Sequence, residues 1–153
     1  SLVGTGAGCG MKPAGLGARG PRRLESGMML NGQDITGETC ALEVPDAWLV
    51  DWNKDFAGKP ALAAIRERGI RKKLAGFEMT GRGIARHGYP VSKDGREIGY
   101  VTSGTFSPTL NKAIGLAFID AENAGPDTEI TIGIRDAASG AKIVQLPFYK
   151  RQK

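Results

Sequence analysis

The stretch GYVTSGTFSPTLNKAIGLAF, at residues 99–118, decides the fold of this chain. It holds two apolar runs, at residues 100–102 and 113–118, on either side of a polar segment. The first run is rich in side chains that fit a pleated surface. The polar segment contains residue types that favour turns: Ser103, Gly104, Ser107 and Pro108. The stretch therefore predicts two strands joined by a wide loop.

The length and composition of the chain are those of an ordinary globular protein. A chain of 153 residues suits one domain, or one domain and a piece of another, and can bury a sizeable core. No apolar run approaches the roughly 20 residues that cross a bilayer, so we expect no membrane segment. Because the chain starts at Ser1 in sequence typical of a domain interior, we expect it to be the C-terminal part of a longer protein.

The surface is expected to be basic, since the net charge is +5 and the pI is near 9.4. We interpret most of this charge as solvated surface, and attraction to an anionic partner is the alternative. Only five Phe and three Tyr accompany the basic residues. Because no aromatic-rich strand of the kind used by RNA-binding modules is present, the sequence disfavours nucleic acid as a partner.

The cysteines and the histidine indicate neither a disulfide nor a metal site. Cys9 and Cys40 fit no paired motif and are expected to be reduced thiols. A zinc site needs more ligands than this chain offers, because His87 is its only histidine. We expect His87 to lie in a loop and to form a hydrogen bond with the backbone.

A first short helix is predicted over residues 21–26. Gly20 and Pro21 are typical of a helix start, and Gly27 is typical of a left-handed residue at the end. Arg19 would then lie just outside the helix N-terminus, where an anion is favoured and an arginine can clamp a carboxylate. From these residues alone, a plain surface arginine is the favoured interpretation and the anion clamp is the alternative.

A second helix is predicted over residues 55–69, where Pro60 would open it and Gly69 would close it. We expect this helix to cap one end of a barrel. In the segment before it, Trp48 and Trp52 are interpreted as residues of the core or of a domain interface, in preference to a ligand-stacking role.

Beyond residue 70 the apolar pattern changes to a period of two. Segments with this character occur at residues 73–79, 97–104, 114–120, 129–135 and 142–148. Turns are predicted at residues 93–95, 125–127 and 139–140, and residues 81–91 are predicted to be a loop that leads into another short strand. Short strands at this spacing, with few helices, predict an antiparallel barrel or sandwich.

Seven segments, in order along the chain, resemble the T-protein family of the glycine cleavage system, the folate-dependent aminomethyltransferases. They are KPAGLGAR at 12–19, RLESG at 23–27, GQDIT at 32–36, DFAGKPAL at 55–62, GFEMTGRGIARHGYPV at 76–91, TSGTFSPTLNKAIGLAF at 102–118 and LPFYKR at 146–151. Several long matches in register are specific, whereas one alone would not be.

The resemblance implies a mainly β chain with short helices. Residues 51–153 would form the antiparallel β-barrel of the aminomethyltransferase C-terminal type, and residues 1–50 would be the end of the folate-binding middle domain and a linker. In that family, the methylene carbon of an aminomethyl group on the lipoylated H-protein is transferred to tetrahydrofolate, with release of ammonia. The implied partners are this H-protein and the N-terminal part of the same protein, in the cytoplasm or, in a eukaryote, the mitochondrial matrix.

The resemblance also suggests two substrate-binding residues. Arg19 matches the family's arginine in GLGAR, which helps to bind the substrate, and Arg151 is a weaker match in the basic tail. The family's catalytic acid lies in the N-terminal part, so no catalytic residue is assigned in this chain. In particular, neither Asp34 nor Glu78 is given that role.

Departures from the family pattern leave alternatives open. The family usually has Asp after the GLGAR arginine, where this chain has Gly20. This difference is compatible with a folate-dependent demethylase that uses another methyl donor. A non-catalytic lid over the folate site, or a module that docks a carrier protein, is the other alternative. The segment at residues 53–60, NKDFAGKP, contains no cysteine, which disfavours the iron–sulfur-maintenance branch of the superfamily.

Overall fold

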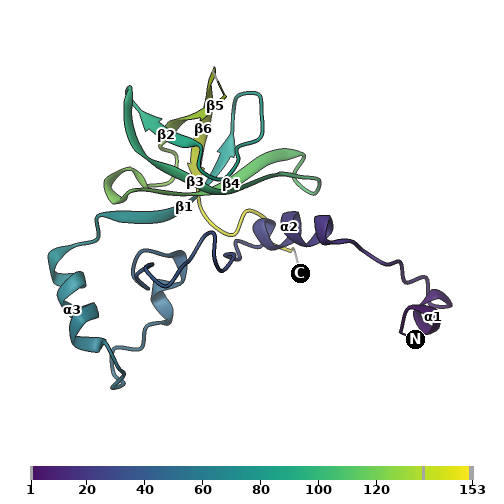
Figure 1. Ribbon diagram of the computed structural model, residues 1–153, viewed down its shortest axis with the longest axis horizontal. Coiled ribbons are helices and arrows are strands. Elements are labelled where there is room, and N and C mark those ends of the chain that lie inside the picture. Colours follow the sequence, from purple (N-terminus) through teal and green to yellow (C-terminus); the bar gives the residue numbers. More distant parts are fainter. Residues whose placement is uncertain (1, 136, 152–153) are drawn as a thin grey trace.

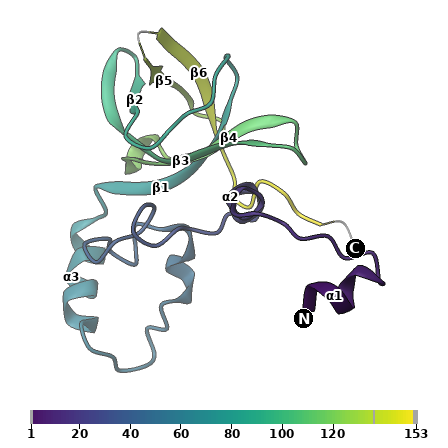
Figure 2. The ribbon, with the colours of Figure 1, turned by 45° about the vertical axis from the view of Figure 1, so that its right-hand side comes forward.

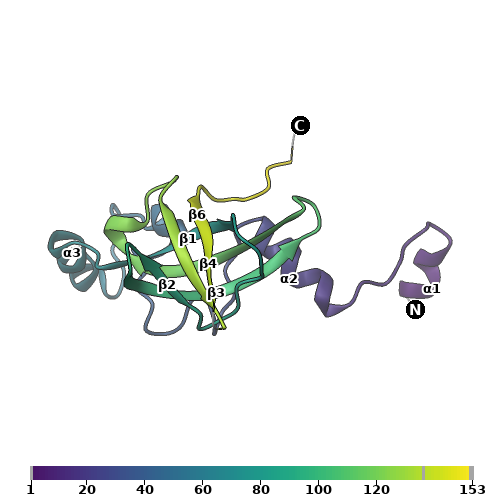
Figure 3. The same ribbon diagram turned by 90° about the horizontal axis from the view of Figure 1, so that it is seen from above.

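The computed structural model describes residues 2–135 and 137–151, as a barrel with an N-terminal segment attached to it (Figure 1). The helices of the described residues are α1 Leu2–Ala7, α2 Leu16–Glu25, the 3-10 helix η1 Pro45–Leu49, α3 Lys59–Arg68 and the 3-10 helix η2 Ala121–Asn123. Helices α1 and α3 lie toward opposite ends of the long axis (Figures 1 and 3). The barrel lies between them.

Six strands of the described residues close into one barrel, in the order β1-β4-β3-β2-β5-β6. They are β1 Lys72–Met79, β2 Pro90–Lys93, β3 Arg96–Ser107, β4 Lys112–Asp120, β5 Glu129–Ile134 and β6 Ala137–Val144. All neighbouring strands pair in antiparallel fashion. Closure leaves no open sheet edge. The mainly β fold and the antiparallel barrel are therefore confirmed.

Strands β3 and β4 show that the predicted wide loop is wrong in its extent. Strand β3 continues through Ser103 and Gly104 to Ser107, so that four residues, at 108–111, separate it from β4. Gly104 is needed inside the strand because a Cβ atom there would lie 2.2 Å from the carbonyl oxygen of Ala85. Gly104 thus reflects close backbone packing in a strand, whereas Pro108 lies in the turn as expected.

Strand β4 is buried along most of its length because apolar clusters lie on both of its faces. The cluster inside the barrel includes Phe77, Val101, Ala117, Ile119, Ile132 and Ile143. The cluster outside it contains Leu24, Val44, Leu74, Ile114, Leu116 and Phe118. Leu24 belongs to α2, which Figure 2 shows nearly end-on directly below the barrel. The N-terminal segment is thus attached to the outer face of β1, β3 and β4.

Helix α2 begins five residues earlier than predicted, at Leu16, and contains Pro21 in its interior. Arg19 is therefore inside the helix, and its predicted place outside the N-terminus is wrong. An interior proline costs about 3 kcal/mol, and the burial of Leu24 and Glu25 against the barrel offsets this cost. Gly27, with φ of 71°, is left-handed as predicted.

Helix α3 has Pro60 in its first turn, as predicted, but it does not cap an end of the barrel. None of its residues is buried. Figure 1 shows that the helix lies outside the barrel and connects to the start of β1. Because none of its side chains is buried, α3 adds nothing to the barrel core. Trp48 is 77% exposed, so its core interpretation is wrong. The guanidinium of Arg66 lies 5.0 Å from the ring centroid of Trp52. The interface interpretation stays a prediction.

The β5–β6 hairpin turns earlier than predicted. Ser139 and Gly140 lie within β6, paired with Ile132 and Thr131, and the strand ends at Val144. Gly140 belongs in the strand because a Cβ atom there would lie 2.8 Å from the hydroxyl of Thr80. The predicted turns at residues 93–95 and 125–127 are confirmed. Across the described residues, no helix is long and apolar enough to span a membrane.

Candidate functional site

Arg19 lies in the N-terminal half of α2, where no residue is buried, and its own side chain is exposed. It lines a cavity of about 260 Å³ together with Leu16, Gly20, Arg23 and Leu30. Arg19 and Arg23 are four positions apart, so they share one helix face. Among the described residues, no carboxylate lies within ion-pair distance of Arg19. Its guanidinium is therefore available to an anionic ligand.

Arg23, the second arginine of this cavity, is bound to a buried carboxylate. Its Nη1 donates to Oδ2 of Asp34 at 2.5 Å, and its Nη2 donates to Oγ of Ser103 at 2.8 Å. The Ser103 hydroxyl in turn donates to Oδ1 of Asp34 at 2.6 Å. These three side chains form a closed ring of hydrogen bonds that joins α2, the loop after it and strand β3.

A β-bulge at Thr102 makes this ring possible. Val101 pairs with Ala117 and Ser103 pairs with Leu116, so Thr102 is an extra residue in β3. Its hydroxyl donates to Oδ1 of Asp34 at 2.6 Å. The carbonyl oxygen of Thr102 accepts a hydrogen bond from Nε2 of Gln33, at 2.6 Å, and lies 3.0 Å from Nδ1 of His87. The predicted loop position and backbone contact of His87 are thus confirmed.

Glu25, at the C-terminal end of α2, is a second buried carboxylate. It accepts hydrogen bonds from the Ser107 hydroxyl at 2.5 Å and from the Thr109 hydroxyl at 3.0 Å. The backbone N–H of Thr109 also donates to it. Glu25 therefore fixes the end of α2 to the β3–β4 turn, whereas Asp34 fixes Arg23, in the last turn of α2, to the bulge.

Arg151 lies in the segment that follows β6. This segment is tied to α2 by the N–H of Tyr149, which donates to the backbone carbonyl of Glu25 at 2.9 Å. Arg151 is exposed, two residues beyond this contact, and does not line the cavity beside Arg19. The structure thus places the two predicted binding residues near the same helix, with Arg19 about 9 Å along the axis from Glu25.

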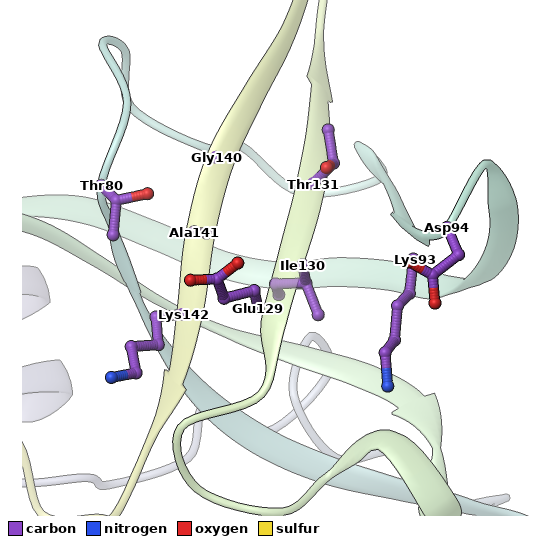
Figure 4. A pocket seen from close by; sticks show the side chains of 9 residues that line it. All are labelled: Thr80, Lys93, Asp94, Glu129, Ile130, Thr131, Gly140, Ala141 and Lys142. Carbon is purple, nitrogen blue, oxygen red and sulfur yellow. The ribbon is translucent and has the colours of Figure 1, made fainter.

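Two other regions offer less to a ligand. A shallow pocket of about 330 Å³ lies across β5 and β6 (Figure 4). Lys142, on its rim, is bound to Asp127 at 2.7 Å, and that hydrogen bond raises the pKa of the lysine above its ordinary value. Lys93 is bound to Asn123. No group of three or more potential metal ligands gathers among the described residues.

A comparison with known protein families identifies the family to which the chain belongs. The family model for the glycine cleavage T-protein C-terminal barrel domain matches residues 72–150. The match coincides with the six strands of the barrel and ends in the segment tied to α2. A closed antiparallel barrel with an N-terminal helix on its outer face is therefore the fold class. The chain belongs to the glycine cleavage T-protein family.

Individual relatives agree with this family. An aminomethyltransferase of Rubrobacter xylanophilus is 51% identical over 146 residues, covering 94% of this chain and 38% of the relative. One of Halothermothrix orenii is 46% identical over 149 residues, covering 97% of this chain and 42% of the relative. The chain thus spans about two fifths of the length of these curated relatives.

A solved structure agrees as well. The crystal structure of glycine cleavage system aminomethyltransferase T from Bartonella henselae superposes with a TM-score of 0.83 at 28% sequence identity. The match covers 89% of this chain and 39% of that chain.

Sequence reasoning did not find the ring formed by Arg23, Asp34 and Ser103. Asp34 follows Asn31 and Gly32, which indicate a turn, and a lone acid near a turn is usually solvated. The one sequence feature that could have indicated a buried Asp34 is its position next to the apolar Ile35, in a segment that must be attached to the barrel.

Proposed function

We propose that this chain is the C-terminal part of a tetrahydrofolate-dependent aminomethyltransferase. In the complete protein, the carbon–sulfur bond between an aminomethyl group and the dihydrolipoyl arm of a carrier H-protein breaks. The methylene carbon is transferred to tetrahydrofolate, and ammonia leaves. The two folate nitrogens that bind the carbon lose one hydrogen each, so the carrier sulfur leaves as a thiol, the amino group leaves as ammonia, and the folate product is methylenetetrahydrofolate.

The observation that carries the proposal is the free guanidinium of Arg19 in its cavity on α2. Tetrahydrofolate carries carboxylates, and arginine binds a carboxylate through two parallel hydrogen bonds. Arg19 has no carboxylate partner among the described residues, whereas its neighbour Arg23 is neutralised by Asp34. The relatives named aminomethyltransferase, at 46–51% identity, support the same reading.

The catalytic acid is proposed to lie outside this chain. Both buried carboxylates at α2 are occupied, since Asp34 accepts hydrogen bonds from four donors and Glu25 from three. Neither is placed to exchange a proton with a substrate. Arg19 and Arg151 are proposed to bind the substrate, and the N-terminal part of the protein is proposed to be the neighbouring partner that supplies the acid.

The test is a calorimetric titration of tetrahydrofolate into the protein and into two variants. Arg19→Ala is expected to weaken binding by about tenfold or more, the equivalent of one charge-assisted contact. Arg22→Ala, an exposed neighbour on the same helix that does not line the cavity, is the matched control and should bind as the parent does. Equal affinity of all three proteins would refute the role of Arg19.

A docking module that lacks chemistry is the second candidate. The net charge of +5 favours it, because a basic surface suits an acidic carrier protein. Turnover decides between the two candidates. Formation of methylenetetrahydrofolate and ammonia by the full-length protein with aminomethylated H-protein supports the enzyme, and salt-sensitive carrier binding without turnover supports the module. A bacterial cytoplasmic location is proposed, since the relatives described above are bacterial.

A further inference from the structure

We propose that Asp34 is a positioning residue for the anion site on α2, acting through Arg23 on the placement and the free charge of Arg19. The inference rests on the proposed function, because it concerns the same cavity. It assigns a task to a buried carboxylate that the transfer reaction itself does not use.

Hydrogen-bond donors surround the side chain of Asp34 and hold it in one place. The carboxylate is fully buried, with an exposed fraction of 0%. Its Oδ1 accepts the hydroxyls of Thr102 and Ser103, and its Oδ2 accepts Nη1 of Arg23 and the N–H of Leu30 at 2.8 Å. Every acceptor position of the carboxylate is therefore occupied. A group held in this way has one orientation, and so does the guanidinium bound to it.

Arg23 transmits this constraint to the cavity. It lines the cavity together with Arg19, one helical turn away on the same face. Two arginines at this spacing repel each other, and the charge of Asp34 cancels that of Arg23. Arg19 is thereby left as the uncompensated guanidinium of the described cavity lining, on a helix whose rotation is fixed by the Arg23–Asp34 contact.

Glu25 provides the matched comparison. It is also a buried carboxylate that anchors α2, with an exposed fraction of 6%, but it contacts Ser107 and Thr109 and not Arg23. A carboxylate that only stabilises the fold should behave as Glu25 does. A positioning carboxylate should instead be coupled to Arg19.

The experiment is a double-mutant cycle on tetrahydrofolate affinity. Arg19→Ala is combined with Asp34→Asn and, separately, with Glu25→Gln, and folding of each variant is checked by circular dichroism. We expect Arg19→Ala to weaken binding about tenfold in the parent and in Glu25→Gln, and by less than about twofold in Asp34→Asn. An equal, tenfold effect of Arg19→Ala in all three backgrounds overturns the inference. If Asp34→Asn does not fold, Ser103→Ala, which opens the same ring with the charges kept, takes its place.

A second readout separates this inference from the proposed function. If the parent does not bind tetrahydrofolate, or if Arg19→Ala leaves its affinity unchanged, the proposed function fails. The amide chemical shifts of residues 16–20 are then compared in the free proteins. Shifts that change in Asp34→Asn and not in Glu25→Gln support the positioning role, and shifts that are unchanged in Asp34→Asn overturn it.

Discussion

The barrel and the N-terminal segment are stabilised in different ways. In the barrel each strand pairs on both sides, and the apolar side chains meet in one closed interior. The segment before α3 has no closed core of its own, and its contact with the barrel runs through α2, the loop after it and the outer face of β4. Eight of the eleven exposed large hydrophobic side chains of the described residues precede residue 57.

This difference teaches that the attachment depends on a few specific contacts. Leu24 supplies apolar burial, and Asp34 and Glu25 supply hydrogen bonds across the contact. Each barrel strand is held by its two neighbours, whereas the loss of any one of these contacts weakens the attachment of the segment. The candidate binding site lies on this segment.

Loss of the barrel core should have the largest effect. Phe77→Ala, at a fully buried interior position, is expected to cost about 3–5 kcal/mol of the free energy of unfolding. Because α2 needs the outer face of the barrel, amide protection of both regions should fall together in hydrogen exchange. Phe106→Ala, at a side chain that is 43% exposed, is the control and should change little. Persistent protection of α2 in Phe77→Ala would contradict the dependence.

Removing the apolar anchor should separate the two regions. Leu24→Ala is expected to cost about 2–3 kcal/mol, the lower part of the range for buried leucine, because the helix can shift on its open side. Hydrogen exchange should then show α2 unprotected while the barrel strands keep their protection. Leu16→Ala, on the same helix and 79% exposed, is the matched control. Simultaneous loss in barrel and helix would mean that they form one cooperative unit.

The anchor at the end of the helix should matter less. Glu25→Gln keeps the shape of the side chain and weakens the hydrogen bonds from Ser107 and Thr109, for an expected loss of about 1–2 kcal/mol. Chemical denaturation measures the change, with the exposed Glu67→Gln on α3 as control. Identical stability of the two variants would show that Glu25 is not an anchor.

The smallest effect is expected on the far side of the barrel. Lys142 and Asp127 form a solvated ion pair, so Lys142→Met should leave stability unchanged within error at neutral pH. Because the pKa of Lys142 is raised by Asp127, its contribution is complete below the ordinary lysine value of 10.5 and is lost as the pH rises through the raised value. A stability loss of Lys142→Met near neutral pH, removed by salt, would contradict this.

The barrel could be predicted from the sequence because a period of two leaves a clear trace in segments such as 73–79 and 114–120. The family could be predicted because several long segments resemble those of the family and occur in the same order along the chain. The ends of the strands were harder to predict from the sequence. Gly104 and Gly140 indicate turns by local rules, but they lie in strands because of close packing between distant segments.

The attachment of the N-terminal segment was the least predictable part. Pro21 indicates a helix start by local rules, and only the burial of Leu24 and Glu25 explains why the helix runs through it. Two of the four hydrogen-bond partners of Asp34, Thr102 and Ser103, lie 68 and 69 residues away in the sequence. No local sequence pattern predicts contacts between residues that are so far apart in the chain. Arg19 was found through the family resemblance and not through its predicted place at a helix end.

The bulge in β3 has a consequence for insertions and deletions. In a regular strand successive side chains point to opposite faces, but the extra residue lets the hydroxyls of Thr102 and Ser103 reach the same carboxylate oxygen. Deletion of Thr102 would leave a regular ladder and an intact barrel, with a single hydroxyl facing Asp34. The number of residues between Val101 and Gly104 therefore sets how many hydroxyls hold Asp34 beside α2, and a relative without the bulge should be recognisable from the length of this segment before any substitution is compared.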